Sequence, residues 1–273
     1  KGNGSLTAEV GEVGITSGDK VDHFSKVVFT AEPDTGYQVK EWKVNSQVVA
    51  ADDGTGLTYT IESLSAAATV TVEFEKVTYT LTYTAGANGS ITGDSPQYIK
   101  YGEDGSEVTA VPADGYHFVK WSDDVDTAKR TDENVTADIT VTATFAINEY
   151  TVTFKDWEDK TIGEPQTVEH GKGASAPDVP ARTGYTFTGW DKTFTNVTED
   201  LTVTAQYSIN THAVTFSVPD GNGSLTAKVG ETAITSGDKV DHFSKVVFTA
   251  DPATGYQVKE WKVNSQVVAA DDG

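Results

Sequence analysis

The feature that most constrains this chain is an internal repeat with a spacing of 219 residues. Residues 221–273 match residues 2–54 at all but five positions. A segment copied this faithfully indicates duplication inside a longer array, in which stacked copies supply length or multivalency rather than a single reactive site. We therefore expect an extended repetitive protein and not one large globule.

A shorter motif, Gly-Tyr-x-[Val/Phe]-x-x-Trp, occurs four times in the chain. Successive copies are 79, 69 and 71 residues apart, so one 219-residue period holds three related modules. The glycine, tyrosine and tryptophan of each copy are the residues that we expect to form a repeated core signature: Gly36, Tyr37, Trp42, Gly115, Tyr116, Trp121, Gly184, Tyr185, Trp190, Gly255, Tyr256 and Trp261.

Each copy of the signature is predicted to be a tight turn that leads into a strand. A proline lies shortly before the glycine in every copy, and glycine tolerates the positive φ that such a turn requires. The i, i+2 spacing places Tyr37 and Val39 on one face of the strand. Because Trp42 falls at an odd offset from that face, we expect a bulge before it.

Threonine-rich runs with period-two alternation are expected to form the first and last strands of each module. The opening runs are residues 79–83, 150–154 and 212–216, and the closing runs are residues 68–74, 138–145 and 201–207. Sustained helical periodicity is absent, and the best candidate for a helical turn is residues 19–25. The sequence thus predicts a mainly β protein.

These runs divide the chain into four modules. We place the N-terminal module at residues 1–76, the second at 77–147, the third at 148–209 and the C-terminal module at 210–273. The first is expected to lack its opening strand and the last its closing strands. The three junctions have equal length and contain no glycine or proline, which predicts a tandem array held as a semi-rigid rod.

Composition narrows the classes of function. The formal net charge is −21, which disfavours nucleic acid and anionic membrane surfaces as partners. The chain has no cysteine, which excludes disulfides and thiol chemistry and favours a bacterial source if the protein is exported. No apolar run is long enough to span a bilayer, so we expect no membrane insertion within this segment.

Residues 150–207 resemble the InlB B-type (Listeria–Bacteroides) repeat of bacterial surface proteins. The shared features are the opening YTVTF, the central VEHGKGASAP, the signature GYTFTGW and the closing LTVTAQY. The other modules, with GNGSLTA or GANGSIT followed by the signature, resemble divergent relatives of that repeat. The resemblance implies small β-grasp-like modules on exported bacterial proteins, often adhesins, without catalytic residues.

Few residues are candidates for chemistry. Trp157 occurs once per period on a polar turn, where it could bind a sugar ring or fold back onto its own module. The aspartates at 52, 53, 123, 124 and 126 could ligate calcium, but they fit neither an EF-hand nor a Gly-Asp repeat loop, so solvated acidic turns are the default interpretation. The five histidines show no paired metal spacing. We expect no enzyme activity, no cofactor and no metal site.

The function expected from these observations is structural: a segment of a giant secreted or cell-surface bacterial fibre or adhesin stalk. The expected partners are further copies of the repeat, in the array or in neighbouring chains. One alternative is a multivalent array that binds a glycan or a host protein through Trp157. A second is a self-assembling extracellular filament joined by strand complementation.

Overall fold

The computed structural model describes residues 2–51 and 56–269. They divide into two compact units, Lys1–Asn148 and Glu149–Gly273, which are considered separately. All regular secondary structure in the described residues is β-strand, which confirms the prediction of a mainly β protein. The helical turn expected at residues 19–25 does not form. Phe24 there has a φ of 67°, which a right-handed helix cannot accommodate.

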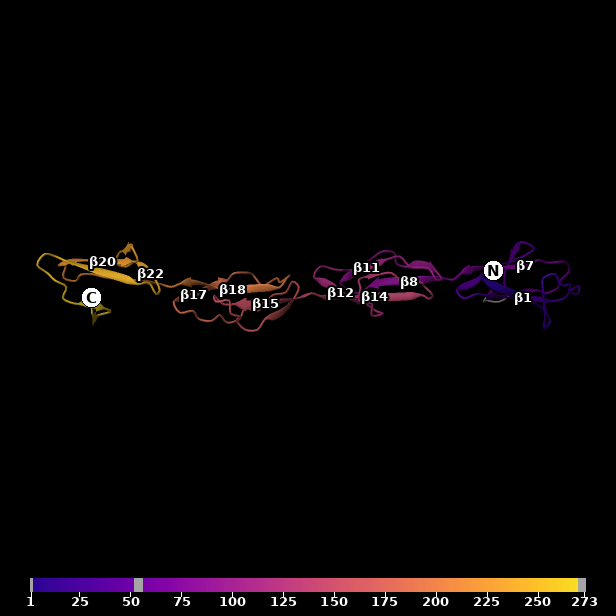
Figure 1. Ribbon diagram of the computed structural model, residues 1–273, viewed down its shortest axis with the longest axis horizontal. Coiled ribbons are helices and arrows are strands. Elements are labelled where there is room, and N and C mark those ends of the chain that lie inside the picture. The colour runs from indigo at the N-terminus through magenta and orange to yellow at the C-terminus, as the bar shows by residue number, and fades with distance from the viewer. Residues whose placement is uncertain (1, 52–55, 270–273) are drawn as a thin grey trace. The chain divides into compact units, whose positions relative to one another are not determined.

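The second module is built on a four-stranded sheet in the order β10-β8-β14-β12. Three of these strands, β8, β12 and β14, are labelled in Figure 1. The opening strand β8 lies in the interior of the sheet, antiparallel to β10 and parallel to the closing strand β14. A smaller sheet has the order β13-β11-β9. The strands are β8 (Thr78–Ala85), β9 (Gly89–Thr92), β10 (Gln97–Lys100), β11 (Val108–Pro112), β12 (Tyr116–Trp121), β13 (Lys129–Arg130) and β14 (Ile139–Ile147).

The third module repeats this arrangement with the sheet order β16-β15-β18-β17. Its opening strand β15 again lies between an antiparallel neighbour, β16, and the parallel closing strand β18. The strands are β15 (Glu149–Lys155), β16 (Gln166–Glu169), β17 (Tyr185–Trp190) and β18 (Leu201–Ile209).

In both modules the opening strand supplies the centre of the core. Leu81 and Tyr83 are buried in the second module, and Val152 and Phe154 are buried in the third. Their partners on the closing strand, Val141 and Val203, are buried as well. An interior strand with alternate residues packed in this way joins the residues of its two neighbours into one core, on which a module of about seventy residues depends for its stability.

The N-terminal module has two sheets, ordered β2-β1-β3-β6 and β5-β4-β7. The closing strand β7 pairs with the signature strand β4 and lies at the edge of its sheet. The strands are β1 (Gly4–Val10), β2 (Val13–Ile15), β3 (Val27–Pro33), β4 (Tyr37–Val44), β5 (Gln47–Val49), β6 (Thr58–Ile61) and β7 (Val70–Lys76).

The C-terminal module has three small sheets, ordered β21-β20-β23, β19-β22 and β24-β25. Its β20–β23 pair has the same register as β1–β3, as the near-identical sequences require. The strands are β19 (Thr211–Ala213), β20 (Gly223–Val229), β21 (Thr232–Ile234), β22 (Lys239–Asp241), β23 (Val246–Pro252), β24 (Trp261–Val263) and β25 (Gln266–Val268).

The signature begins with the predicted turn in all four modules. The tyrosine N–H donates to the carbonyl oxygen three residues earlier, as from Tyr37 to Asp34 and from Tyr116 to Ala113. The glycine between them has φ between 76° and 87° in every copy. That value belongs to the third position of a type II turn, which glycine occupies without strain.

The predicted bulge is present in the three modules whose closing strand is described. The register shifts between Val39 and Glu41, between Phe118 and Lys120, and between Phe187 and Gly189. One extra residue on the signature strand returns the tryptophan to the inward face.

Candidate functional sites

The tryptophans of the signature differ in burial between modules. Trp42 and Trp121 are 1% and 0% exposed, and their indole N–H groups donate to Gly56 O and Thr127 O. Trp190 is half-buried and packs edge-on against Phe154, while Trp261 is half-buried in the C-terminal module. The tyrosines Tyr37, Tyr116 and Tyr185 are half-buried, whereas Tyr256 is 58% exposed.

The signature glycine of the N-terminal module lies at a contact with the second module. Val77 connects the two: its N–H donates to Gly36 O at 2.9 Å, and its carbonyl accepts from Tyr101 N–H at 2.8 Å. The Tyr101 ring occupies the space that a side chain at Gly36 would need, since a Cβ there would lie 2.1 Å from the ring. Lys76 and Glu103 form an ion pair alongside.

The third and C-terminal modules meet through the same set of contacts. Asn210 N–H donates to Gly184 O at 2.8 Å, and Asn210 O accepts from His242 N–H at 2.7 Å. The His242 ring lies over Gly184, where a Cβ would be 2.5 Å away. His242 also shares a 2.8 Å hydrogen bond between ring nitrogens with His212. Both units therefore contain a junction in which backbone hydrogen bonds and a ring on glycine join two modules.

Trp157 is half-buried in an aromatic cluster on the third module. Its ring packs edge-on against Tyr207 with centroids 5.1 Å apart. The Arg182 guanidinium lies 3.6 Å from the centroid of Tyr185 and 5.2 Å from that of Trp157. Tyr207 donates to Pro180 O, and burial, followed by the charge of Asp156, raises the pKa of its phenol. Trp157 thus folds back onto its own module and leaves part of its ring exposed.

A buried ionic network lies beneath the signature of the second module. The Arg130 guanidinium, 7% exposed, pairs with Asp132 and Asp123. Tyr83 Oη donates to Asp132 at 2.6 Å. Burial acts to raise the pKa of Asp132, but hydrogen bonds from Arg130 and Tyr83 outweigh it and hold that pKa below its usual value. Arg130 also lies 5.7 Å from the Trp121 ring, so the network supports the core.

Two aspartates of the acidic run that could have held calcium pair with the chain's own cations. Asp123 accepts from Arg130, and Asp124 accepts from Lys120 at 2.7 Å. Asp52 and Asp53 lie outside the described residues. Within residues 2–51 and 56–269, no group of three or more histidine, aspartate or glutamate side chains could hold a metal ion.

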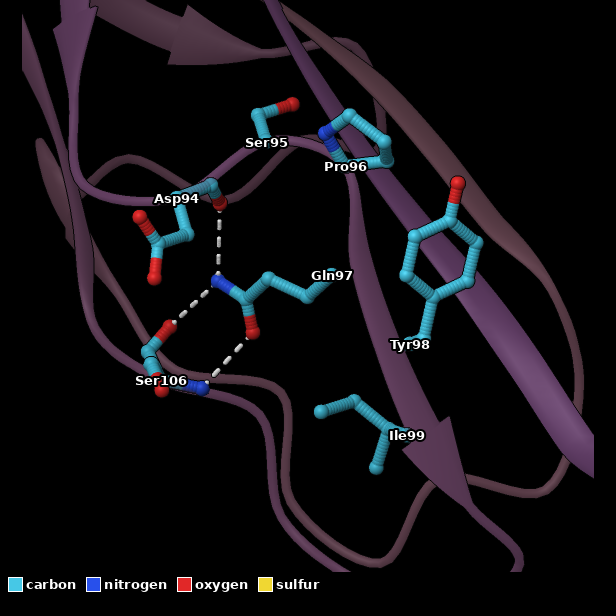
Figure 2. Close-up of a pocket in the computed structure, with 7 residues that line it drawn as sticks. All are labelled: Asp94, Ser95, Pro96, Gln97, Tyr98, Ile99 and Ser106. Atoms are coloured by element: carbon cyan, nitrogen blue, oxygen red, sulfur yellow. Dashed lines mark hydrogen bonds between the residues drawn. The ribbon is translucent and has the colours of Figure 1, made fainter.

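A surface depression in the second module is lined by Asp94, Ser95, Pro96, Gln97, Tyr98, Ile99 and Ser106 (Figure 2). At its base the Gln97 amide donates to Asp94 O and Ser106 O and accepts from Ser106 N–H (Figure 2). Gln166 and Ser175 make the same pair of bonds in the third module, also nine residues apart. Because both the amide nitrogen and the amide oxygen of Gln97 are hydrogen-bonded within the chain, we assign the side chain to stabilising a loop and not to binding a ligand.

No helix in the described part of the chain is long and apolar enough to cross a membrane.

The repeated sheet order, the bulged signature strand and the hydrogen-bonded junctions define the class: a tandem array of small β modules. Comparison with family models also divides the chain into consecutive repeat domains. Residues 2–78, 79–149 and 216–272 match the divergent InlB B-repeat domain, and residues 150–213 match the Listeria-Bacteroides repeat domain. The chain belongs to this family of InlB B-type repeats, as its sequence predicts.

Three relatives show the kind of protein that carries such repeats. A putative membrane protein of Evansella cellulosilytica is 26% identical over 68% of this chain, and Internalin H of Listeria monocytogenes is 32% identical over 52%. A putative Gly-rich membrane protein of E. cellulosilytica is 25% identical over 67%. The match spans only 28%, 28% and 21% of the lengths of these relatives. The chain thus consists of repeat domains of a kind found in bacterial internalin and membrane proteins.

Several of these features could not be predicted from the sequence. The junction contacts join residues such as Gly36 and Tyr101 that no local pattern connects. The His212–His242 pair is thirty residues apart and has no metal-type spacing. The glutamine–serine pair could have been found, because PQ followed by serine nine residues after the glutamine occurs in both the second and third modules.

Proposed function

We propose that this chain is a non-catalytic structural segment of a secreted or cell-surface bacterial fibre or adhesin stalk. The observation that carries the proposal is the repeated junction. Gly36, Val77 and Tyr101 in one unit and Gly184, Asn210 and His242 in the other make the same backbone bonds, with a ring on the glycine. A repeated connection of this kind suits a protein whose role is to extend.

Stiffness follows from the chemistry of the junction. The connecting residue donates to one module and accepts from the next, so bending there would break backbone hydrogen bonds. The ring on glycine adds an apolar contact that a longer side chain would prevent. We propose a semi-rigid rod of β-grasp-like modules, each about 25–30 Å across by size scaling, with about 80 Å per three-module period.

Location is proposed from the relatives and from composition. Two relatives are described as membrane proteins and a third is an internalin. A chain without cysteine and with a net charge of −21 remains soluble without depending on the redox state of its surroundings.

Labelling of intact cells tests this proposal. Antibodies against the purified chain are applied to the source bacterium before and after permeabilisation, with a cytoplasmic protein as the control. We expect signal on intact cells, and its loss after brief trypsin treatment. Signal that appears only together with the cytoplasmic control would overturn the proposal.

A second candidate function is binding of a glycan or host protein by the aromatic cluster of the third module. The observation that favours it is the part-exposed Trp157 beside Arg182 and the 38% exposed Phe187, since aromatic rings with a nearby cation are typical recognition surfaces. Repetition of the module along an array would raise the avidity.

A glycan array and a panel of host extracellular proteins, probed with the native chain, Trp157→Ala and Tyr98→Ala, test this second candidate. Tyr98 is 71% exposed and lies in another module, which makes it the matched control. We expect a ligand that binds the native chain and Tyr98→Ala but not Trp157→Ala. Equal binding by all three proteins would exclude the cluster as the site.

A further inference from the structure

Two aromatic positions lie close together in the second, third and C-terminal modules. The first is on the opening strand, and the second directly follows the strand that pairs with it. The second module has tyrosine at both positions, Tyr79 and Tyr101. The C-terminal module has histidine at both, His212 and His242. Because histidine offers ring nitrogens that tyrosine lacks, the pair in the C-terminal module can bind what a tyrosine pair cannot.

The strand register brings the two histidines together. β19 pairs with β22 so that His212 faces Val240, and His242 follows two residues later on the same side. Nε2 of His212 and Nδ1 of His242 are 2.8 Å apart, and the ring centroids are 4.9 Å apart. The rings therefore share a hydrogen bond in which one nitrogen donates and the other accepts.

The same placement occurs in the third module, which contains both its opening and its closing strand. There Tyr150 faces Val168, and His170 follows two residues later. Tyr150 Oη and His170 Nδ1 are 3.4 Å apart, and both residues are half-buried. The closeness of the two positions is therefore a property of the module fold.

The ring of His242 is held from two sides. It lies over Gly184 of the third module, where a Cβ would be 2.5 Å away. Phe243 packs edge-on against it with ring centroids 4.1 Å apart. The identical segment of the N-terminal module places His23 and Phe24 in a similar contact at 3.9 Å, so the local sequence sets this arrangement. A ring held in this way loses little freedom when it binds an ion.

The separation of the two ring nitrogens fits a particular metal geometry. Neutral imidazole is a common ligand of divalent transition metals. With metal–nitrogen bonds of about 2.0 Å, neighbouring ligands lie about 2.8 Å apart in a square-planar or tetragonal site and about 3.3 Å apart in a tetrahedral one. The observed 2.8 Å matches the first geometry, which Cu²⁺ and Ni²⁺ prefer, and is too short for tetrahedral Zn²⁺.

We propose that His212 and His242 form a binding site for Cu²⁺ or Ni²⁺, with water in the remaining coordination positions. The ion takes the place of the proton between the rings. Each ring turns so that its lone pair points at the ion, and the ring that donated the hydrogen bond carries its proton on its other nitrogen. The net charge of −21 raises the local concentration of cations around the chain.

An ion bound by this pair should strengthen the junction between the third and C-terminal modules. The His242 ring lies over Gly184, so joining His242 to His212 also fixes the contact with the third module. The junction at Gly36 carries Tyr101 in the equivalent place and should not respond. This inference does not depend on where the protein acts or on the stiffness of the array.

Calorimetric titration of the full chain with Cu²⁺, Ni²⁺ and Zn²⁺ tests the site. His212→Tyr and His242→Tyr each remove one ligand and introduce the residue that the second module has at that position. His170→Tyr is the matched control, because His170 lies beside a tyrosine and not beside a second histidine. Thermal unfolding without metal, unchanged from the native chain, shows that each variant is folded.

We expect the native chain and His170→Tyr to bind about one Cu²⁺ or Ni²⁺ ion each, and Zn²⁺ more weakly than Cu²⁺. His212→Tyr and His242→Tyr should each lose affinity by at least about tenfold. Pulsed EPR of the native chain loaded with Cu²⁺ should detect two imidazole nitrogens. Hydrogen exchange with Ni²⁺ present should become slower at the amides of Asn210 and His242, and should not change at Tyr101.

The proposal is wrong if the native chain binds neither Cu²⁺ nor Ni²⁺ at millimolar concentration, or if all three variants lose affinity equally. Tighter binding of Zn²⁺ than of Cu²⁺, a single imidazole nitrogen in the EPR spectrum, or unchanged exchange at Asn210 and His242 would also contradict it.

Discussion

The ring of Tyr101 lies against the α-carbon of Gly36, so closely that a Cβ on Gly36 would be 2.1 Å from Cδ1 of the ring. The two residues belong to adjacent modules, and the backbone of Val77 is hydrogen-bonded to both. The glycine of the signature thus has two roles. It permits the turn at φ 79°, and it leaves room for the ring of the next module.

Replacing Gly36 by alanine should therefore cost more than backbone strain alone. Gly11→Ala is the matched control, because Gly11 has a φ of 66° and nothing within 4 Å of its would-be Cβ. The control should lose about 1 kcal/mol of stability from strain. Gly36→Ala should lose more, and amide exchange should become faster at Val77 and Tyr101. Equal effects of the two changes would show that the ring contact is unimportant.

The core of the second module depends on Trp121, which is fully buried and donates to Thr127 O. Trp121→Ala should destabilise that module by about 3–5 kcal/mol, the usual cost of emptying such a site. Val119→Ala, at a neighbouring position that is 39% exposed, should change stability by about 0.5 kcal/mol or less.

Hydrogen-exchange mass spectrometry locates the damage from Trp121→Ala. We expect loss of protection in residues 77–147 and unchanged protection in residues 149–209. Loss throughout the chain would mean that the modules do not fold separately.

The network of Arg130, Asp132 and Tyr83 predicts a pH dependence. Because the pKa of Asp132 is lowered in the folded chain, its contribution to stability is complete above the value of an unfolded aspartate, about 3.9. It is lost as the pH falls from there through the folded value.

Asp132→Asn tests this linkage. At neutral pH it should cost about 2 kcal/mol, since buried Arg130 keeps only Asp123 as a charged partner. The unfolding free energies of the native chain and the variant, measured with denaturant, should converge below about pH 4. A difference that stays constant with pH would contradict the assignment.

Substitution of Gln97 should change the stability of the second module, because its amide holds a loop by hydrogen bonds. Gln97→Leu removes the partner of Ser106 N–H and should cost about 1–3 kcal/mol through an unsatisfied buried group. Tyr98→Ala, at the adjacent 71% exposed position, should have little effect on thermal unfolding. A neutral Gln97→Leu would show that the loop needs no such support.

Local features of this fold could be predicted from the sequence, because local residues cause them. The turn before Tyr37 follows from proline and glycine spacing, and the bulge before Trp42 follows from the odd offset of an apolar residue on an alternating strand.

Contacts between distant residues could not be predicted in this way. Tyr101 on Gly36 and His242 on Gly184 depend on how neighbouring modules pack, which no periodicity encodes. The helical turn expected at residues 19–25 is also wrong. Phe24 has a φ of 67°, and Phe243 in the identical segment 238–244 has a φ of 68°, so both copies of the segment form the same left-handed turn in place of a helix.

The proposal that the array is a semi-rigid rod is tested most directly by small-angle X-ray scattering from a chain of two consecutive 219-residue periods. We predict a rod whose maximum dimension grows in proportion to the number of modules, by about 25–30 Å for each. A compact particle, or a flexible chain whose dimension grows more slowly than the module count, would contradict the account.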